Sequence, residues 1–338
     1  MKSRIERTGG NIVNRIYEKV VSVLQFVDHG KGASHFQKGR EYQNLDQHVR
    51  AISHLNKAIE VDPKYVSAYV LRGISYLRLD KFDQAIGDFS DALSWEKNEE
   101  VAYFNRALAY TKIGETELAI EDYGEALRLN PNYVSARANR AVLWMKIGKA
   151  RAAASDFNKA IRDLPDYPNL YFGRGTAWFE LGNLADAIED FDCCISLEPE
   201  HARAYCYRAR IRTVTGDLLA AQADFSVAEE LGYEGIGLYQ FRGDLHRRMG
   251  NETLAESDLR QALLLDEQES GTTYAFLALL YAAKDRSEEF YEALTMALDQ
   301  GYRIWEASFL HDPALDNFRG MQRFRELMKT YRDGEGTS

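Results

Sequence analysis

The segment AYFNRALAYTKIGETELAIEDYGEALRLNP, residues 102–131, is punctuated like two antiparallel helices joined by a turn. Gly114 stands in its middle, where the C-terminus of a first helix favours a residue that accepts a left-handed conformation. Pro131 stands at its end, where a proline prevents a second helix from continuing. Apolar and small residues recur on both sides of Gly114 with helical spacing. We therefore predict a helical hairpin in this segment.

The same hairpin recurs along the chain with a period of 34 residues. Six copies align without gaps over residues 66–269, an earlier copy covers 32–65, and a looser copy begins near Gly271. Position 8 of the repeat is glycine or alanine, position 20 is alanine, and position 24 is aromatic in five of the six copies. Small side chains let neighbouring helices approach, and the rings fill the remaining space. Because one hairpin cannot bury these faces alone, the copies must stack into a solenoid.

This pattern resembles that of the tetratricopeptide repeat family, which has small residues at positions 8, 20 and 27 and aromatic residues at 4, 11 and 24. A proline closes the unit at position 32, and the resemblance covers residues 32–302. It implies an all-α fold, a right-handed α-solenoid of stacked helix–turn–helix hairpins whose first helices line a concave groove. It also implies a role in holding partner proteins without catalysis. The departures are Lys97, Tyr233 and Glu267 in place of the proline, and Cys194 in place of the alanine at position 27; they loosen individual joints without threatening the fold.

The domain organisation follows from the repeat register. We expect an N-terminal tail and amphipathic capping helix, about eight repeats, C-terminal capping helices and a disordered tail. Their bounds are 1–31 for the tail and first cap, 32–65, 66–99, 100–133, 134–167, 168–201, 202–235, 236–269 and 271–304 for the repeats, 305–332 for the second cap and 333–338 for the disordered tail. The N-terminal helix, residues 11–28, could instead dimerise, fill the chain's own groove or lie on a membrane surface. The membrane alternative is the weakest, because the polar face is mixed in charge rather than basic.

Charged residues recur in register inside the hairpins. Position 7 is arginine and position 23 is aspartate in six consecutive repeats: Arg72, Arg106, Arg140, Arg174, Arg208 and Arg242 with Asp88, Asp122, Asp156, Asp190, Asp224 and Asp258. In a hairpin that turns near position 16, positions 7 and 23 lie at nearly the same height, given a rise of about 1.5 Å per residue. We predict bidentate ion pairs that fix the register of the two helices, rather than a cationic ladder for a ligand.

The bulk composition limits the class of function. The chain has 338 residues, of which 45% are hydrophobic and 28% are charged, and these fractions are typical of a soluble folded protein. Its net charge of −10 argues against nucleic-acid binding, because phosphate affinity needs a basic surface. The three cysteines fit neither a disulfide framework nor a zinc ribbon, so a reducing compartment and a cytoplasmic location are expected. No signal peptide or membrane span is evident.

No constellation of catalytic or metal-binding residues is found. The histidines lack HxxxH and HExxH spacing, and the adjacent Cys193 and Cys194 would point in different directions on a helix. We therefore expect a non-catalytic protein with no cofactor, no metal and no small-molecule substrate.

The candidate binding surface is the groove that the resemblance implies. Family geometry places positions 2, 5, 9 and 12 of each first helix on the concave side, and these are mostly apolar in the central repeats and polar or basic further on. The predicted partner-binding residues are Val70, Ile74, Leu77, Phe104, Leu108, Val142, Met145, Phe172, Phe179, Arg203, Arg210 and Arg247. We hypothesise that the groove binds an apolar peptide and that the basic end grips an acidic residue. Tight superhelical curvature or the N-terminal helix could instead bury part of this lining.

Three functions of different class remain. The first is a scaffold or adaptor that binds a protein or peptide partner of unknown identity. The second is a structural subunit whose groove is filled within a homo-oligomer or a larger assembly. The third is nucleic-acid binding through Arg203, Arg210, Arg247 and Arg248, which ranks last because of the acidic net charge.

Overall fold

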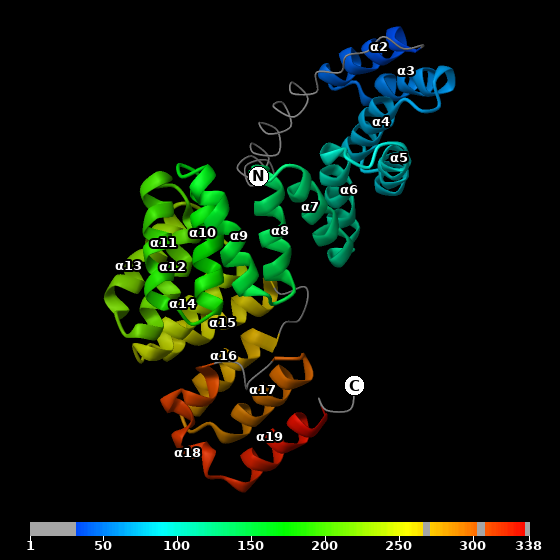
Figure 1. Ribbon diagram of the computed structural model, residues 1–338. Coiled ribbons are helices and arrows are strands. Elements are labelled where there is room, and N and C mark those ends of the chain that lie inside the picture. Colours follow the sequence, from blue (N-terminus) through cyan, green and yellow to red (C-terminus); the bar gives the residue numbers. More distant parts are fainter. Residues whose placement is uncertain (1–31, 266–270, 303–307, 335–338) are drawn as a thin grey trace. The chain divides into compact units, whose positions relative to one another are not determined.

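The computed structural model describes residues 32–265, 271–302 and 308–334, which form α-helices and short 3₁₀ helices with no strand among them (Figure 1). The chain divides into two compact units, residues 1–181 and 182–338. The predicted N-terminal helix, residues 11–28, lies outside the described residues. The fold class is confirmed, because the described chain is an all-α array of stacked hairpins.

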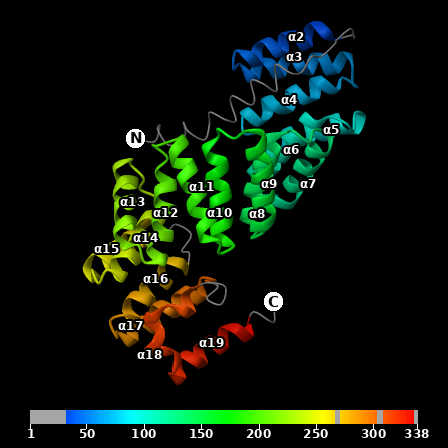
Figure 2. The ribbon, with the colours of Figure 1, turned by 60° about the vertical axis from the view of Figure 1, so that its left-hand side comes forward.

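Unit 1 contains four hairpins and the first helix of a fifth. Each hairpin packs its two helices against each other, and each second helix packs against the first helix of the next hairpin. Figure 2 shows this succession of antiparallel helices. The helices are α2 (Ala33–Asn44), α3 (His48–Val61), α4 (Val66–Arg78), α5 (Phe82–Trp95), α6 (Glu100–Ile113), α7 (Thr116–Leu129), α8 (Val134–Lys146), α9 (Ala150–Asp163) and α10 (Pro168–Glu180).

Unit 2 begins with the second helix of the fifth hairpin and ends in shorter elements that follow the repeats. Its helices are α11 (Leu184–Leu197), α12 (Ala202–Thr215), α13 (Leu218–Glu230), α14 (Ile236–Arg248), α15 (Glu252–Leu265), α16 (Gly271–Ala282), α17 (Ser287–Asp299), η2 (Ser308–His311), η3 (Pro313–Leu315), α18 (Asp316–Arg319) and α19 (Gln322–Gly334).

Each first helix ends at a residue with a left-handed backbone conformation, as the turn glycines predict. Position 15 is a glycine with φ between 71° and 91° in five repeats: Gly114, Gly148, Gly182, Gly216 and Gly250. In the three remaining repeats an aspartate takes this place with φ between 52° and 57°: Asp46, Asp80 and Asp285. Aspartate tolerates this region better than most side chains, because its carboxylate can bond to the nearby backbone.

The core is divided among successive hairpins rather than gathered in one centre. Small residues let the helices approach closely. A Cβ atom added at Gly73 would lie 2.7 Å from the ring of Phe89, which is fully buried, and Ala85 of the same hairpin is also fully buried. The aromatic residue at position 24 therefore fills the space that the small residue at position 8 leaves open.

The C-terminal elements cover the last repeat. Phe318 and Phe324 pack against Phe290 of α17, with ring centroids 4.2 Å and 6.2 Å away. Leu315, from η3, is buried in the same cluster. Disorder is predicted from residue 333, but α19 continues to Gly334; residues 335–338 lie outside the described residues.

Candidate functional site

The arginines at position 7 form the predicted ion pairs. In the second complete hairpin of the aligned series, Arg106 Nε lies 2.7 Å from Asp122 Oδ2, and Arg106 Nη2 lies 2.8 Å from Asp122 Oδ1. The same bidentate geometry joins Arg72 to Asp88, Arg140 to Asp156, Arg208 to Asp224 and Arg242 to Asp258. These five pairs confirm the prediction. The sixth, Arg174 and Asp190, has its two members in different units.

Burial and pairing shift the titration of these groups in opposite directions. Hydrogen bonds to Asp122 raise the pKa of Arg106, which keeps the guanidinium charged. Burial raises the pKa of Asp88, outweighing the hydrogen bond from Arg72 that lowers it. Burial also acts on Asp258, but the contacts with His246 and Arg242 together lower its pKa. The cost of burying the charges therefore offsets the attraction within each pair. This is expected of pairs that fix the register of two helices rather than add much stability.

Five of these arginines also bond to the second helix of the preceding hairpin. Their Nη1 atoms donate to position 25 of the preceding second helix in four joints: Arg72 to Asn56, Arg106 to Ser90, Arg174 to Asn158 and Arg208 to Asp192. In a fifth joint, Arg242 Nη1 lies 3.1 Å from Glu229 Oε2. The arginines thus belong to the frame, and the groove residues beside them are the candidates for binding.

Four of the predicted groove residues are buried. The exposed fractions are 0% for Val70, 1% for Ile74, and 8% for both Phe104 and Phe172. The reason is visible at Phe104, whose ring stacks 4.6 Å from that of Tyr133, the residue that precedes α8. Three of the four stand at position 5, so this position packs against the neighbouring hairpin. These four side chains are part of the packed core between helices and are not accessible to a partner.

Five other predicted residues of unit 1 remain accessible. Val142 is 58% exposed, and Leu77, Leu108, Met145 and Phe179 are partly exposed. They stand at positions 9 and 12 of the first helices α4, α6, α8 and α10, of which α4 contacts α6 and α8 contacts α10. We call these five residues the first-helix surface.

The predicted basic residues belong to unit 2, and one of them is not available. Arg247 Nη2 lies 2.6 Å from Asp244 Oδ1 and 2.7 Å from Asp312 Oδ2, and its side chain is 7% exposed. The prediction that Arg247 binds a partner is therefore corrected, because its charge is satisfied within the chain. Arg203 is exposed, and Arg210 lies over the ring of Phe241 with its guanidinium carbon 4.2 Å from the centroid.

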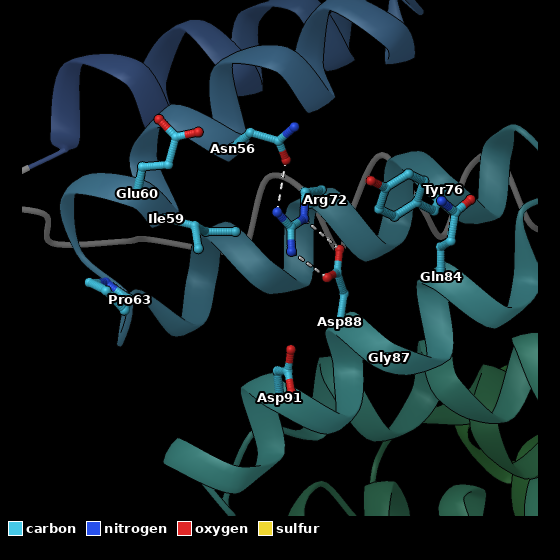
Figure 3. A pocket seen from close by; sticks show the side chains of 10 residues that line it. All are labelled: Asn56, Ile59, Glu60, Pro63, Arg72, Tyr76, Gln84, Gly87, Asp88 and Asp91. Atoms are coloured by element: carbon cyan, nitrogen blue, oxygen red, sulfur yellow. Dashed lines mark hydrogen bonds and ion pairs between the residues drawn. The ribbon is translucent and has the colours of Figure 1, made fainter.

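A cleft that the sequence did not reveal lies between α3, α4 and α5 (Figure 3). Its volume is about 620 Å³, and the Arg72–Asp88 pair forms part of its wall. Glu60 and Asp91 add two carboxylates to the lining, and Gly87 leaves one side open. The residues come from two successive repeats, so the repeat register assigns equivalent positions to the other joints.

None of the helices in residues 32–265, 271–302 and 308–334 combines the length and the apolarity needed to cross a bilayer. No three histidine, cysteine, aspartate or glutamate side chains within the same residues are grouped so that they could hold a metal ion.

Comparison with known proteins identifies the repeat. Family models described as tetratricopeptide repeat match residues 33–65, 101–133, 145–192 and 236–269. No curated protein matches the chain.

Solved structures share the fold at low sequence identity. A tetratricopeptide repeat protein from Parabacteroides merdae has a TM-score of 0.56 at 22% identity, over 79% of this chain and 98% of that chain. PilF from Pseudomonas aeruginosa has a TM-score of 0.55 at 18% identity, over 63% and 97%. A chain of the APC/C hetero-tetramer Cut9–Hcn1 has a TM-score of 0.58 at 18% identity, over 89% and 59%. With the repeat register, the helix pairs and the family matches in agreement, the repeats of this chain are tetratricopeptide repeats.

Proposed function

We propose that this protein is a non-catalytic scaffold that binds a protein partner through the first-helix surface of unit 1. The repeats themselves support a role in protein interaction. The observation that carries the finer proposal is that each of four consecutive first helices has an accessible apolar side chain at position 9, at position 12 or at both. A single exposed apolar residue is ordinary, whereas a repeated series is typical of an interaction surface.

The chemistry of this surface favours an apolar segment of the partner. Val142 is the most exposed member at 58%, and it has Met145 one turn further along α8. Both side chains lack charge, so the energy of binding would come from apolar area removed from water. Met145 adds an adaptable side chain that can fit irregular partners. A peptide with apolar anchors, helical or extended, fits this surface.

The hypothesis that the basic end of the groove binds an acidic residue of the partner now has less support. The guanidinium of Arg247 is already paired with the carboxylates of Asp244 and Asp312, so it is not available to an acidic residue of a partner. We therefore restrict the proposed site to unit 1 and do not require the basic residues for binding.

The test uses charge introduced at one exposed position. Val142→Asp should lower the affinity for a partner co-purified from native extract by at least roughly tenfold, because burying Val contributes about 1.5–3 kcal/mol and a buried unpaired charge costs more. The matched control is Leu118→Asp on α7, a second helix, where Leu118 is 41% exposed. This control should bind as the unaltered protein does.

The outcomes separate the alternatives. Equal binding by both variants would contradict the proposed site. If the captured species is a second copy of this chain and Val142→Asp makes the protein monomeric, the homo-oligomer is the correct function and the adaptor is not.

A further inference from the structure

One of the six arginines at position 7 differs from the others in what surrounds it. In five of them, Nη1 bonds to an oxygen atom of a side chain in the preceding second helix; the acceptors are Asn56, Ser90, Asn158, Asp192 and Glu229. Arg140 is the exception. Its Nε and Nη2 bind Asp156, at 2.8 Å each, but its Nη1 has no hydrogen-bond partner among the described residues.

The cause is a glycine at position 25. Gly124 stands where Asn56, Ser90, Asn158 and Asp192 stand in the other joints, so α7 supplies no side-chain oxygen. A Cβ atom added at Gly124 would lie 3.7 Å from Arg140 Nη1, and no other neighbouring side chain lies within 4 Å of it. The missing side chain leaves a notch beside the guanidinium edge.

A second contact is missing at the same arginine. The other five guanidinium groups lie over a tyrosine at position 4, with carbon-to-centroid distances from 5.3 Å to 5.7 Å: Tyr69, Tyr103, Tyr171, Tyr205 and Tyr239. In the repeat of Arg140 this position is Arg137, which is itself bonded to Asp163. The side chain of Arg140 is 23% exposed, compared with 13% to 19% for Arg72, Arg106, Arg208 and Arg242. Among the described residues, the Arg140 guanidinium thus lacks both the Nη1 hydrogen bond and the ring contact that the other five guanidinium groups make.

The surroundings of this notch follow from the cleft in Figure 3, which shows how equivalent positions gather around Arg72. In the repeat register, the residues 68 positions later are the equivalents of these residues at the joint of Arg140. Glu60 and Asp91 of the cleft correspond to Arg128 and Lys159, so two carboxylates are replaced by two cations. Arg128 bonds to Glu125 on its own helix, while Lys159 has no such partner among the described residues.

We propose that the notch formed by Gly124, Arg140, Arg128 and Lys159 binds a carboxylate side chain of a partner protein. Each of the other five joints with an arginine at position 7 supplies an oxygen acceptor to the same guanidinium atom, and in two of them that acceptor is a carboxylate, from Asp192 or Glu229. A carboxylate from outside would complete the contact that Gly124 omits and would face cations rather than acids. This site goes beyond the proposed function, because it lies at a joint with a second helix and not on the first-helix surface.

The test follows the side-chain NMR signals of the arginines in the full chain during titration with glutarate, a dicarboxylate like the glutamate side chain. Sodium chloride at equal ionic strength is the reference, and inorganic phosphate is a parallel arm. We expect a saturable shift of the Arg140 signals several times larger than that of Arg106. Gly124→Asn should abolish this shift, because the new amide oxygen would bond to Nη1 as Asn56 does in its joint.

Gly87→Asn on α5 is the matched control, since an added Cβ atom there meets nothing within 4 Å. It should leave the response of Arg140 intact. If Gly124→Asn does not fold, Gly124→Ser, which copies Ser90, replaces it. Equal shifts at Arg140 and Arg106, or a response that survives in the variant, would overturn the site. A response to phosphate alone would overturn its assignment to a carboxylate.

Discussion

The pair of Arg106 and Asp122 offers the sharpest test of the frame. Asp122 is 6% exposed and accepts two hydrogen bonds from a guanidinium whose side chain is 19% exposed. Removing one partner of a buried ion pair costs roughly 3–5 kcal/mol, whereas replacing both with apolar residues is often nearly neutral. Arg106 would keep its bond to Ser90, so Asp122→Ala should cost about 3 kcal/mol, the lower end of that range.

The double variant Arg106→Met with Asp122→Leu should cost about 1 kcal/mol or less. The assay is native-state hydrogen exchange of the amides in α6 and α7, because repeats can open locally and a single global transition is not assured. The loss of about 3 kcal/mol corresponds to a fall in protection of roughly a hundredfold or more. Equal losses in the single and double variants would refute the pairing, since the remaining charge would then cost nothing.

Three further perturbations have defined outcomes. Burial and a neighbouring carboxylate raise the pKa of Glu99 to about 7, so the native state binds this proton more tightly and stability falls as pH rises from about 4.5 to 7. Glu99→Gln should remove that fall between pH 5 and pH 8 in urea unfolding. Gly173→Ala should lower the free energy of unfolding by about 1–3 kcal/mol, because its Cβ would lie 2.4 Å from the Phe157 ring. Gly87→Ala should raise the free energy of unfolding by about 0.5–1 kcal/mol in the same assay, because the added Cβ would meet no atom within 4 Å. Asp312→Ala leaves two arginines of α14, Arg247 and Arg248, underpaired, so residues 308–334 should exchange at least roughly tenfold faster, and unchanged exchange would contradict the contact.

Internal repetition explains how much of the frame the sequence could predict. The joint recurrence of arginine and aspartate at positions 7 and 23 pointed to contacts such as Arg106–Asp122, because the geometry of a hairpin fixes which positions meet. The turn glycines predicted left-handed residues for the same reason. The aspartates that replace them, such as Asp80, carry no comparable signal in a single chain.

The candidate site was harder to predict, because it depends on packing between hairpins. Position 5 looked like open lining, yet Phe104 is covered by Tyr133 of the next repeat. Arg247 looked like a free cation, yet Asp312, 65 residues away, lies outside the repeat register. The unbonded Nη1 of Arg140 shows the reverse case, since Gly124 and Arg137 already distinguish its joint in the sequence.

The first-helix surface is best tested by site-specific photo-crosslinking in native extract. A benzophenone amino acid placed in turn at positions 108, 142 and 145 should crosslink to one partner species, since these side chains are accessible on first helices. The same group at position 118, on the second helix α7, should not. Crosslinks to that species from position 118 but not from position 142 would contradict the proposed binding surface.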